Sequence, residues 1–307
     1  MESTKPGTMP SVRANGLTIH YDEIGEGEPA LLVAGLGMQL IGWDDEFCDR
    51  LAARGFRVIR FDNRDVGLSS WLDHLPTASM AVLFWQTLMG LPIRPPYSLD
   101  DMAGDAVGLL DALGIASAHV IGVSMGGMIA QSMAIQAPRR VRSLTSIMSH
   151  PGDGASKVPE PRALRVFLGP RSVTRDQAIR RYIDTFRTIG SPGLGGTEDG
   201  YLRRRAERAY DRSFHPRGIV RQTAAVVAAG NRIRALGRIQ VPTLVLHGSR
   251  DPLVPPRGGR ATARAIPGAT LRIIPGMGHD LPPGAWPIII DAITELAAGR
   301  PSRAAVP

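Results

Sequence analysis

Residues 118–129 carry the strongest fold signal of the sequence, Ala118-His119-Val120-Ile121-Gly122-Val123-Ser124-Met125-Gly126-Gly127-Met128-Ile129. The first half, residues 118–123, is a short, β-branched apolar run, which predicts a strand buried on both faces. Apolar residues at helical spacing then continue from Met128 to Ala137 and stop at Pro138, which predicts a helix. The tight turn between them has the pattern G-x-S-x-G and presents the hydroxyl of Ser124.

Further short apolar runs lie on both sides of this stretch. They cover residues 30–34, 58–61, 144–148, 243–247 and 271–274. Their length and β-branched content fit the buried strands of a mainly parallel sheet. An antiparallel pair is predicted before them, because Asn15-Gly16 is a type I′ turn signal between residues 11–14 and the alternating residues 17–21. We therefore expect a mainly parallel sheet of eight strands.

Helical patterns alternate with these runs. Phe47, Leu51 and Ala52 recur at helical spacing and stop before Gly55. Ser98 is placed to cap another helix, whose end is marked by Gly114. Strands that alternate with helices predict crossover connections, and hence an α/β fold in which helices flank the sheet.

The alternation lapses between residues 151 and 237. This segment is helix-like, poor in strand patterns and rich in arginine, and the alternation resumes at Val241. We interpret the segment as a helical cap inserted into one α/β core. The predicted organisation is a first part of the core at residues 1–150, the cap at 151–237 and a second part of the core at 238–307.

The composition excludes several classes of protein. The chain has 307 residues, of which 43% are hydrophobic and 21% charged, as in globular proteins and unlike disordered ones. Its single cysteine, Cys48, can form neither an internal disulfide nor a cysteine-based zinc site. Residues 1–12 hold no apolar run like that of a secretory signal, and the most apolar stretch, 78–91, is too short to span a bilayer. We expect a cytoplasmic protein with no stable membrane insertion.

The net charge of +8 is concentrated in one part of the chain. Between Pro161 and Arg238 there are 17 arginines and six acidic residues, and the remainder is slightly negative. One hypothesis is a basic surface that attracts acidic substrates, nucleic acid or anionic lipid. The other, which we favour, is a set of solvated helix faces. We expect no nucleic-acid partner, because no aromatic-interleaved basic motif or reader module accompanies the arginines.

The serine of the G-x-S-x-G turn needs further groups to become reactive. A hydroxyl is a poor nucleophile until a base removes its proton, so a histidine and a carboxylate that orients it are required. His279 follows the last predicted strand, at the edge of the sheet where the active sites of open α/β sheets gather. Asp251 follows the strand at 243–247 and is the favoured carboxylate, with Asp153 as a substitute. The expected catalytic residues are Ser124, Asp251 and His279.

The oxyanion of a tetrahedral intermediate needs N–H donors that are in place before the reaction. One donor is expected from Met125, which follows the nucleophile. The second is expected from Leu36, because Gly35 and Gly37 on either side allow the backbone to turn that amide inward.

With its chain order Ser124, Asp251, His279, the sequence resembles the α/β-hydrolase superfamily over nearly its whole length outside the cap. Three stretches are similar to the branch of small esterases related to aclacinomycin methylesterase and similar actinobacterial lipase/esterase-like proteins: GW-DEF at residues 42–47, VIRFDNRDVGLS at 58–69 and IPGMGH at 274–279. The resemblance implies an α/β-hydrolase fold, the same triad, a cap over the pocket and no cofactor. Ala34 departs from the pattern, because many members have histidine before the oxyanion glycine.

Other residues near these motifs have two interpretations. The charged group Asp62, Arg64 and Asp65 follows a predicted strand, and we expect it to hold a loop beside the active site rather than to act in the reaction. Trp43 and Trp85 are candidate substrate-binding residues in an apolar pocket. Core packing or docking of the cap is the alternative for these two side chains.

The sequence therefore predicts a serine hydrolase that cleaves carboxylic esters through an acyl-enzyme, without a metal or cofactor. The expected partner is a small-molecule substrate, a methyl ester or another small to medium hydrophobic ester. The alternatives are a cofactor-free perhydrolase, a long-chain lipase or thioesterase, and a non-catalytic small-molecule binding protein on a hydrolase scaffold. The natural ester, the conformation of the cap and the oligomeric state, a homo-oligomer included, stay open.

Overall fold

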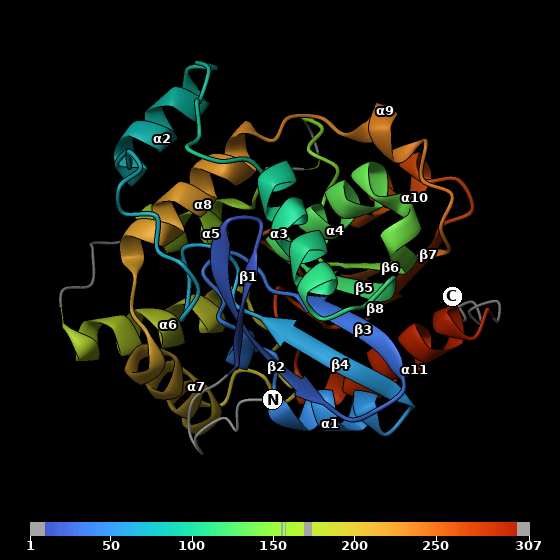
Figure 1. Cartoon of the computed structure of the whole chain (residues 1–307). Coiled ribbons are helices and arrows are strands. Elements are labelled where there is room, and N and C mark those ends of the chain that lie inside the picture. Colours follow the sequence, from blue (N-terminus) through green and yellow to red (C-terminus); the bar gives the residue numbers. More distant parts are fainter. Residues whose placement is uncertain (1–9, 155, 157, 169–173, 300–307) are drawn as a thin grey trace.

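The sheet of this computed structural model has eight strands in its described part, in the order β1-β2-β4-β3-β5-β6-β7-β8 (Figure 1). They are β1 (Ser11–Ala14), β2 (Leu17–Ile24), β3 (Glu28–Val33), β4 (Phe56–Phe61), β5 (Ala118–Val123), β6 (Val141–Ile147), β7 (Thr243–Gly248) and β8 (Thr270–Ile274). The pairs β1–β2 and β2–β4 are antiparallel, and all pairs from β4 to β8 are parallel. The predicted mainly parallel eight-stranded sheet is confirmed.

The structure describes residues 10–299 except 155, 157 and 169–173. Most of the polar N-terminal segment, residues 1–9, lies outside the described residues. The predicted hairpin turn follows directly, with positive φ angles of 48° at Asn15 and 78° at Gly16, as a type I′ turn requires. Among the described residues, no helix is both long and apolar enough to cross a bilayer.

Helices cover both faces of the sheet. On one face lie α3 (Leu99–Ala112), α4 (Met125–Gln136) and α10 (Arg257–Ala265), and on the other lie α1 (Asp45–Ala52) and α11 (Trp286–Ala297), as Figure 1 shows. Two apolar cores, one on each face, hold these layers together. Ser98 caps α3 as predicted, in a reciprocal capping box with Asp101. Helix α4 begins three residues earlier than the apolar spacing indicates, because the turn at Ser124 leads straight into it.

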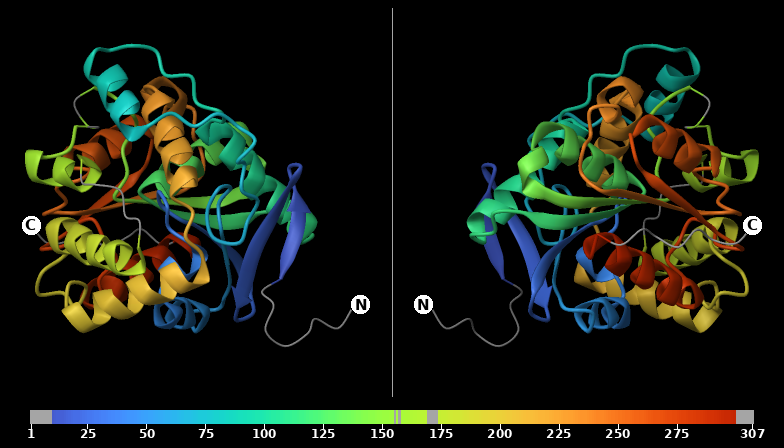
Figure 2. Two further views of the ribbon diagram at one scale, coloured as in Figure 1. Left: turned by 90° about the vertical axis from the view of Figure 1, so that its left-hand side faces the viewer. Right: turned by 90° about the vertical axis from the view of Figure 1, so that its right-hand side faces the viewer.

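A helical segment separates β6 from β7. It contains α5 (Pro161–Leu168), α6 (Arg175–Ile189), α7 (Asp199–Arg212), α8 (Pro216–Ala228) and α9 (Ile233–Leu236), and its described residues form no strand. Helices α6, α7 and α8 lie at the carboxyl ends of the parallel strands, as the left view of Figure 2 shows. The helix α2 (Met80–Leu88) projects beside α8. That residues 151–237 act as a cap between two parts of one core stays a prediction.

Arginines of this inserted segment pair with acids of the core. Arg212 lies 2.7 Å from Asp62, and Arg221 lies 2.7 Å from Asp65 in a pair whose side chains are both fully buried. Asp62 also accepts the backbone N–H groups of Leu40 and Leu68. These contacts agree with the structural role expected for the group at residues 62–65. They also show that several arginines join the insertion to the core instead of facing water.

Candidate active site

The turn at Ser124 has a backbone that only small neighbours allow. Ser124 joins β5 to α4 with φ 54° and ψ −119°, a conformation that L-residues rarely adopt. A Cβ at Gly122 would lie 2.1 Å from the carbonyl oxygen of Gly126, and a Cβ at Gly126 would lie 2.0 Å from that of Val33. The glycines two residues before and after the serine are therefore required by close backbone contacts, and they leave the serine side chain partly exposed.

The structure brings Ser124, His279 and Asp251 together from the ends of three different strands. His279 Nε2 lies 2.9 Å from Ser124 Oγ, and His279 Nδ1 lies 2.7 Å from Asp251 Oδ2. Asp251 is fully buried, and its other oxygen accepts the N–H groups of Leu253 and Val254, each at 2.9 Å. A carboxylate fixed in this way orients the imidazole with Nδ1 protonated, so that Nε2 is available to accept the proton of Ser124.

Three other titratable groups near this arrangement make no hydrogen bond to Ser124 or His279 in the described chain, namely His247, Asp280 and Asp153. His247 Nε2 donates to the carbonyl of Val254 at 2.6 Å, and burial lowers the pKa of His247, so the ring is neutral at neutral pH. Asp280 accepts from the N–H and the hydroxyl of Ser191, and burial raises the pKa of its carboxyl. Asp153, the substitute acid, makes no hydrogen bond to His279 in the described part of the chain.

The loop after β3 is held in place from two sides. Asn63 Nδ2 donates to the carbonyl of Ala34 at 3.0 Å, and the N–H of Gly37 donates to Gln222 Oε1 of α8 at 2.8 Å. Gln222 is itself fully buried and donates through Nε2 to the carbonyl of Arg64 at 2.8 Å. Asn63 and Gln222 thus support this loop, in which Ala34 stands where many family members have histidine.

The amides of Leu36 and Met125 were the predicted oxyanion donors. Met125 opens α4 directly after Ser124, and Leu36 stands in the loop after β3. Neither amide has a backbone acceptor among the described residues, whereas the next loop amides, of Gly37 and Met38, are bonded to Gln222 and to the carbonyl of Gly35. Gly35 lies against this site, since a Cβ there would be 3.5 Å from Ser124 Cβ. Neither amide therefore has an acceptor in the described chain that would compete with an oxyanion, and their role as donors stays a prediction.

The inserted segment also contacts the loop that carries His279. The N–H of His279 donates to the carbonyl of Ile189 at 2.6 Å, and the N–H of Gly278 donates to Ser191 Oγ at 2.7 Å. Sequence reasoning missed Ser191 and Gln222, because both lie in the insertion and no motif marks them. The only signal was the Ser191-Pro192-Gly193 sequence, which indicates a turn and not a contact.

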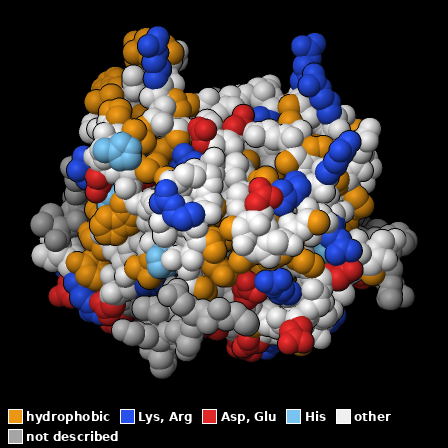
Figure 3. Space-filling view, viewed as in Figure 1, with side chains coloured by type: hydrophobic (Ala, Val, Ile, Leu, Met, Phe, Trp, Pro, Cys, Tyr) orange, Lys and Arg blue, Asp and Glu red, His pale blue; other side chains and the backbone are white. Residues whose placement is uncertain are grey.

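The two tryptophans proposed for substrate binding lie in different surroundings. Trp43 is fully buried and stacks on Phe47, with ring centroids 5.8 Å apart, in the core on the α1–α11 face. Trp85 is 61% exposed on α2. Hydrophobic side chains gather over the region of α2 in Figure 3. Neither ring makes a hydrogen bond to Ser124, His279 or Asp251 in the described chain, and their role in substrate binding stays a prediction.

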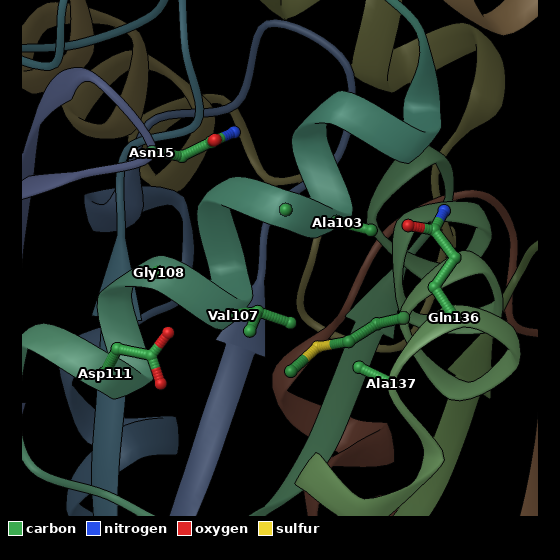
Figure 4. Close-up of a pocket in the computed structure, with 9 residues that line it drawn as sticks. Asn15, Ala103, Val107, Gly108, Asp111, Gln136 and Ala137 are labelled. Atoms are coloured by element: carbon green, nitrogen blue, oxygen red, sulfur yellow. The ribbon is translucent and has the colours of Figure 1, made fainter.

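Two hollows of the surface lie away from Ser124. Figure 4 shows one of about 350 Å³ between the β1–β2 hairpin, α3 and α4, lined by residues that include Asn15, Val107, Asp111 and Gln136. The other, of about 450 Å³, lies between α2 and α8. Neither includes a member of the Ser124–His279–Asp251 group in its lining. Within the described residues, no three His, Cys, Asp or Glu side chains gather as a metal site would require.

The fold and this arrangement define a member of the α/β-hydrolase fold family, and the chain belongs to it: the family matches residues 29–282. The chain is 31% identical to rhodomycin D methylesterase of Streptomyces sp. (strain C5) and 30% identical to that of Streptomyces peucetius. In both comparisons the match covers 83% of this chain and 85% of the relative. The family that the sequence motifs indicated is confirmed.

Solved structures agree on the fold. A meta-cleavage product hydrolase of Pseudomonas fluorescens IP01 is 19% identical, with a TM-score of 0.73 over 94% of this chain and 97% of the other. An esterase of Thermogutta terrifontis is 21% identical, with a TM-score of 0.68 over 95% of this chain and 99% of the other. At these identities, the structures show the fold alone.

Proposed function

We propose that the chain is a serine hydrolase that cleaves carboxylic esters through an acyl-enzyme intermediate. The observation that carries the proposal is the unbroken series of hydrogen bonds from Ser124 Oγ through His279 to the buried carboxylate of Asp251, at 2.9 and 2.7 Å. A hydroxyl, an imidazole and a carboxylate in this order are the groups that acyl transfer requires. Membership of the α/β-hydrolase family and the similarity to two methylesterases support it.

Each proposed step is assigned to a group of this chain or to water. Ser124 attacks the ester carbonyl while His279 Nε2 accepts its proton, and Asp251 stabilises the imidazolium that forms. The amides of Leu36 and Met125 bind the oxyanion. His279 then protonates the leaving alcohol. A water that His279 deprotonates attacks the Ser124 ester, the bond from the acyl carbon to Oγ breaks, His279 returns the proton to Oγ, and the carboxylic acid is released.

The proposed substrate is a methyl ester or another small to medium hydrophobic ester. Two relatives are named for hydrolysis of a methyl ester, and the inserted helices at the carboxyl ends of the strands lie where they can restrict entry to Ser124. We propose that residues 151–237 act as the cap and that the protein works in the cytoplasm on a small molecule. Under this proposal, nucleic acid and membrane are not partners.

The test is hydrolysis of p-nitrophenyl acetate by the full chain and by two serine variants. We expect a burst of p-nitrophenol equal to the enzyme concentration and a loss of kcat of about 10⁴-fold or more in Ser124→Ala. Ser117→Ala, at a position without a side-chain hydrogen bond in the described chain, is the matched control and should keep full activity. Stoichiometric release without turnover would instead indicate a binding protein.

Chain-length profiling distinguishes the remaining alternatives. With p-nitrophenyl esters from acetate to palmitate, a small esterase should have its highest kcat/KM at short acyl chains. A maximum at long chains would indicate a lipase or thioesterase, and peroxide-dependent production of peracid faster than hydrolysis would indicate a perhydrolase.

A further inference from the structure

The two ends of the inserted segment meet at Arg232. The chain leaves the core after β6, through residues 149–153, and returns through residues 230–232 before α9. The N–H of Arg232 donates to the carbonyl of Pro151 at 2.8 Å. Gly152, with φ 86°, packs so tightly here that a Cβ would lie 1.8 Å from the carbonyl oxygen of Gly230. Backbone contacts therefore close the base of the insertion, and the side chain of Arg232 is enclosed there.

The guanidinium of Arg232 is buried with only part of its hydrogen-bonding capacity used. The residue is 9% exposed. Its Nη2 donates to the carbonyl of His150 at 2.8 Å and to Gln131 Oε1 at 3.2 Å. Its Nε and Nη1 are buried and have no hydrogen-bond partner in the structure. Burial lowers the pKa of Arg232 to about 10, so the group is still a cation at neutral pH.

Other buried arginines of this protein have a carboxylate partner, which Arg232 lacks. Arg221 is paired with Asp65, Arg64 with Asp105, and Arg60 with Asp22 and Asp45, all within 2.7 Å. Over the described ranges, no carboxylate lies within ion-pair distance of Arg232, and its two acceptors are neutral. Asp100 attracts this cation from beyond ion-pair distance, but burial outweighs that attraction. A buried cation without an anionic partner in contact is strongly disfavoured, because it has lost its hydration.

Hydrogen-bond donors in the neighbouring elements are unused as well. Ser132 adjoins Gln131 on α4, and Ser149 adjoins His150 in the loop after β6. The Oγ atoms of both serines are buried and have no partner. These hydroxyls belong to the two elements that hold the acceptors of Arg232. At Arg232 itself, two unused guanidinium nitrogens provide donors for a negatively charged acceptor.

We propose that Arg232 binds a small monovalent anion, of the chloride class, between α4, residues 149–153 and residues 230–232. The size limit follows from the closure of the site, since neither Nε nor Nη1 is reached by solvent. The anion supplies the charge that carboxylates supply to Arg60, Arg64 and Arg221. Because Arg232 bonds to the departing chain and itself lies on the returning chain, the anion fastens the base of the insertion to α4.

The first test is the melting temperature of the full chain at constant ionic strength, with sodium gluconate replaced stepwise by sodium chloride or bromide. We expect a saturable rise of about 2–4 °C, as binding to the folded state alone produces. Arg232→Met should abolish the rise. Arg234→Gln, which removes an equal charge from an exposed position two residues away, should keep it. A flat response of the unmodified chain, or a rise that persists in Arg232→Met, would overturn the proposal.

The second test does not depend on the folding of a variant. Crystals of the unmodified chain grown in bromide should show an anomalous peak within hydrogen-bond distance of Nε or Nη1 of Arg232. Bromide bound only elsewhere would refute the site. So would a direct ion pair of Arg232 with Asp153, whose Oδ1 is also buried without a partner and which a change in the 149–153 loop could bring nearer.

Discussion

Ser124 has a positive-φ backbone conformation, and glycines at three nearby positions allow the close backbone packing that maintains it. The three glycines Gly122, Gly126 and Gly127 each have backbone or side-chain atoms within 2.7 Å of where a Cβ would be. Strain at a single residue is thus maintained by close packing of β3, β5, β6 and α4 around it. The hydroxyl that this turn presents is the group on which the proposed chemistry depends.

The contact at Gly126 gives a direct prediction. In Gly126→Ala the new methyl group meets the carbonyl oxygen of Val33, which is backbone and cannot rotate away. We expect the free energy of unfolding to fall by more than about 2 kcal/mol and kcat to fall with it, because α4 must shift relative to β3. Urea denaturation and ester hydrolysis measure the two effects. Gly154→Ala, at a position with no atom within 4 Å of its Cβ, is the control, and equal stability of both variants would contradict the packing argument.

The two tryptophans make a second prediction at the scale of the residue. Trp43→Ala should lower the free energy of unfolding by about 3–5 kcal/mol, because the fully buried ring stacks on Phe47. Trp85→Ala should change it by no more than about 0.5 kcal/mol, because the ring is largely in water. The KM for p-nitrophenyl butyrate, measured in parallel, tests the separate prediction of substrate binding, and a tenfold rise in Trp85→Ala would support that role for α2.

Among the strands and helices, the positions of the strands could be predicted well from the sequence, whereas the buried residues of the inserted helices could not. Runs such as 118–123 and 243–247 are apolar throughout, because both faces of a central parallel strand are covered, and their bounds agree closely with β5 and β7. Helix α8 has no comparable signal. Its buried residues include Arg221 and Gln222, which a reading based on hydrophobic periodicity assigns to the surface. Their partners lie about 150 residues earlier in the chain, at a separation that local patterns do not reveal.

The same distinction applies to the candidate site. Ser124, Asp251 and His279 could be predicted because each follows a strand, and the carboxyl ends of parallel strands share one edge of the sheet. The hydrogen bonds that support the loop after β3 could not be predicted from the sequence, because they depend on the position of α8 over that loop. Gln222 is the clearest example, since its side chain connects Gly37 with the carbonyl of Arg64 and belongs to no motif.

The contribution of α8 to the site can be tested by substituting Gln222. Removing its amide in Gln222→Leu leaves the N–H of Gly37 without its acceptor and loosens the loop that presents the amide of Leu36. We expect kcat to fall about tenfold with KM within twofold, since loss of an oxyanion donor outright costs 10²–10³ in kcat. Gln39→Leu is the matched control, because Gln39 also bonds the core to the insertion, through the carbonyls of Ala209 and Ser213. A similar loss of kcat in both variants would mean a general effect of loosening the insertion.

The uneven distribution of charge along the chain has a structural explanation. The insertion is basic and the rest of the chain slightly acidic, and the contact between them includes several pairs of opposite charges. Helices α7 and α8 supply arginines to acids on the core side, in the pairs Arg205–Asp44, Arg208–Asp45, Arg212–Asp62 and Arg221–Asp65. On the face shown in Figure 3, basic side chains are scattered and several lie beside acidic ones. These paired arginines therefore form neither a basic docking surface nor purely solvated helix faces.

This contact makes stability depend on pH in the acid range. Burial is the largest influence on Asp65 and disfavours its ionisation, but its hydrogen bonds, chiefly from Arg221 and the N–H of Leu72, and the charge of Arg221 together lower the pKa of the carboxyl. The hydrogen bonds and charges of Arg208 and Arg60 together outweigh burial at Asp45 in the same way. A carboxyl whose pKa is lower in the folded than in the unfolded chain contributes stability that is complete above its unfolded pKa, near 4. That contribution is lost as the pH falls through the folded value. Asp280 has the opposite sign, because burial raises its pKa, and its contribution is lost as the pH rises.

The Asp65–Arg221 pair allows the effect to be isolated. Asp65→Asn combined with Arg221→Met removes both buried charges, and asparagine tolerates the φ of 67° and keeps an acceptor for the N–H of Leu72. We therefore expect the free energy of unfolding at pH 6 to change far less than in Arg221→Met alone. Between pH 5 and pH 3 this double variant should lose less stability than the unmodified chain, because one lowered carboxyl pKa is gone. Arg221→Met alone leaves Asp65 buried and unpaired and should cost about 3–5 kcal/mol at pH 6. Urea denaturation followed by tryptophan fluorescence gives all three values, and equal acid sensitivity of the double variant and the unmodified chain would show that the acid-labile part of the molecule lies outside this pair.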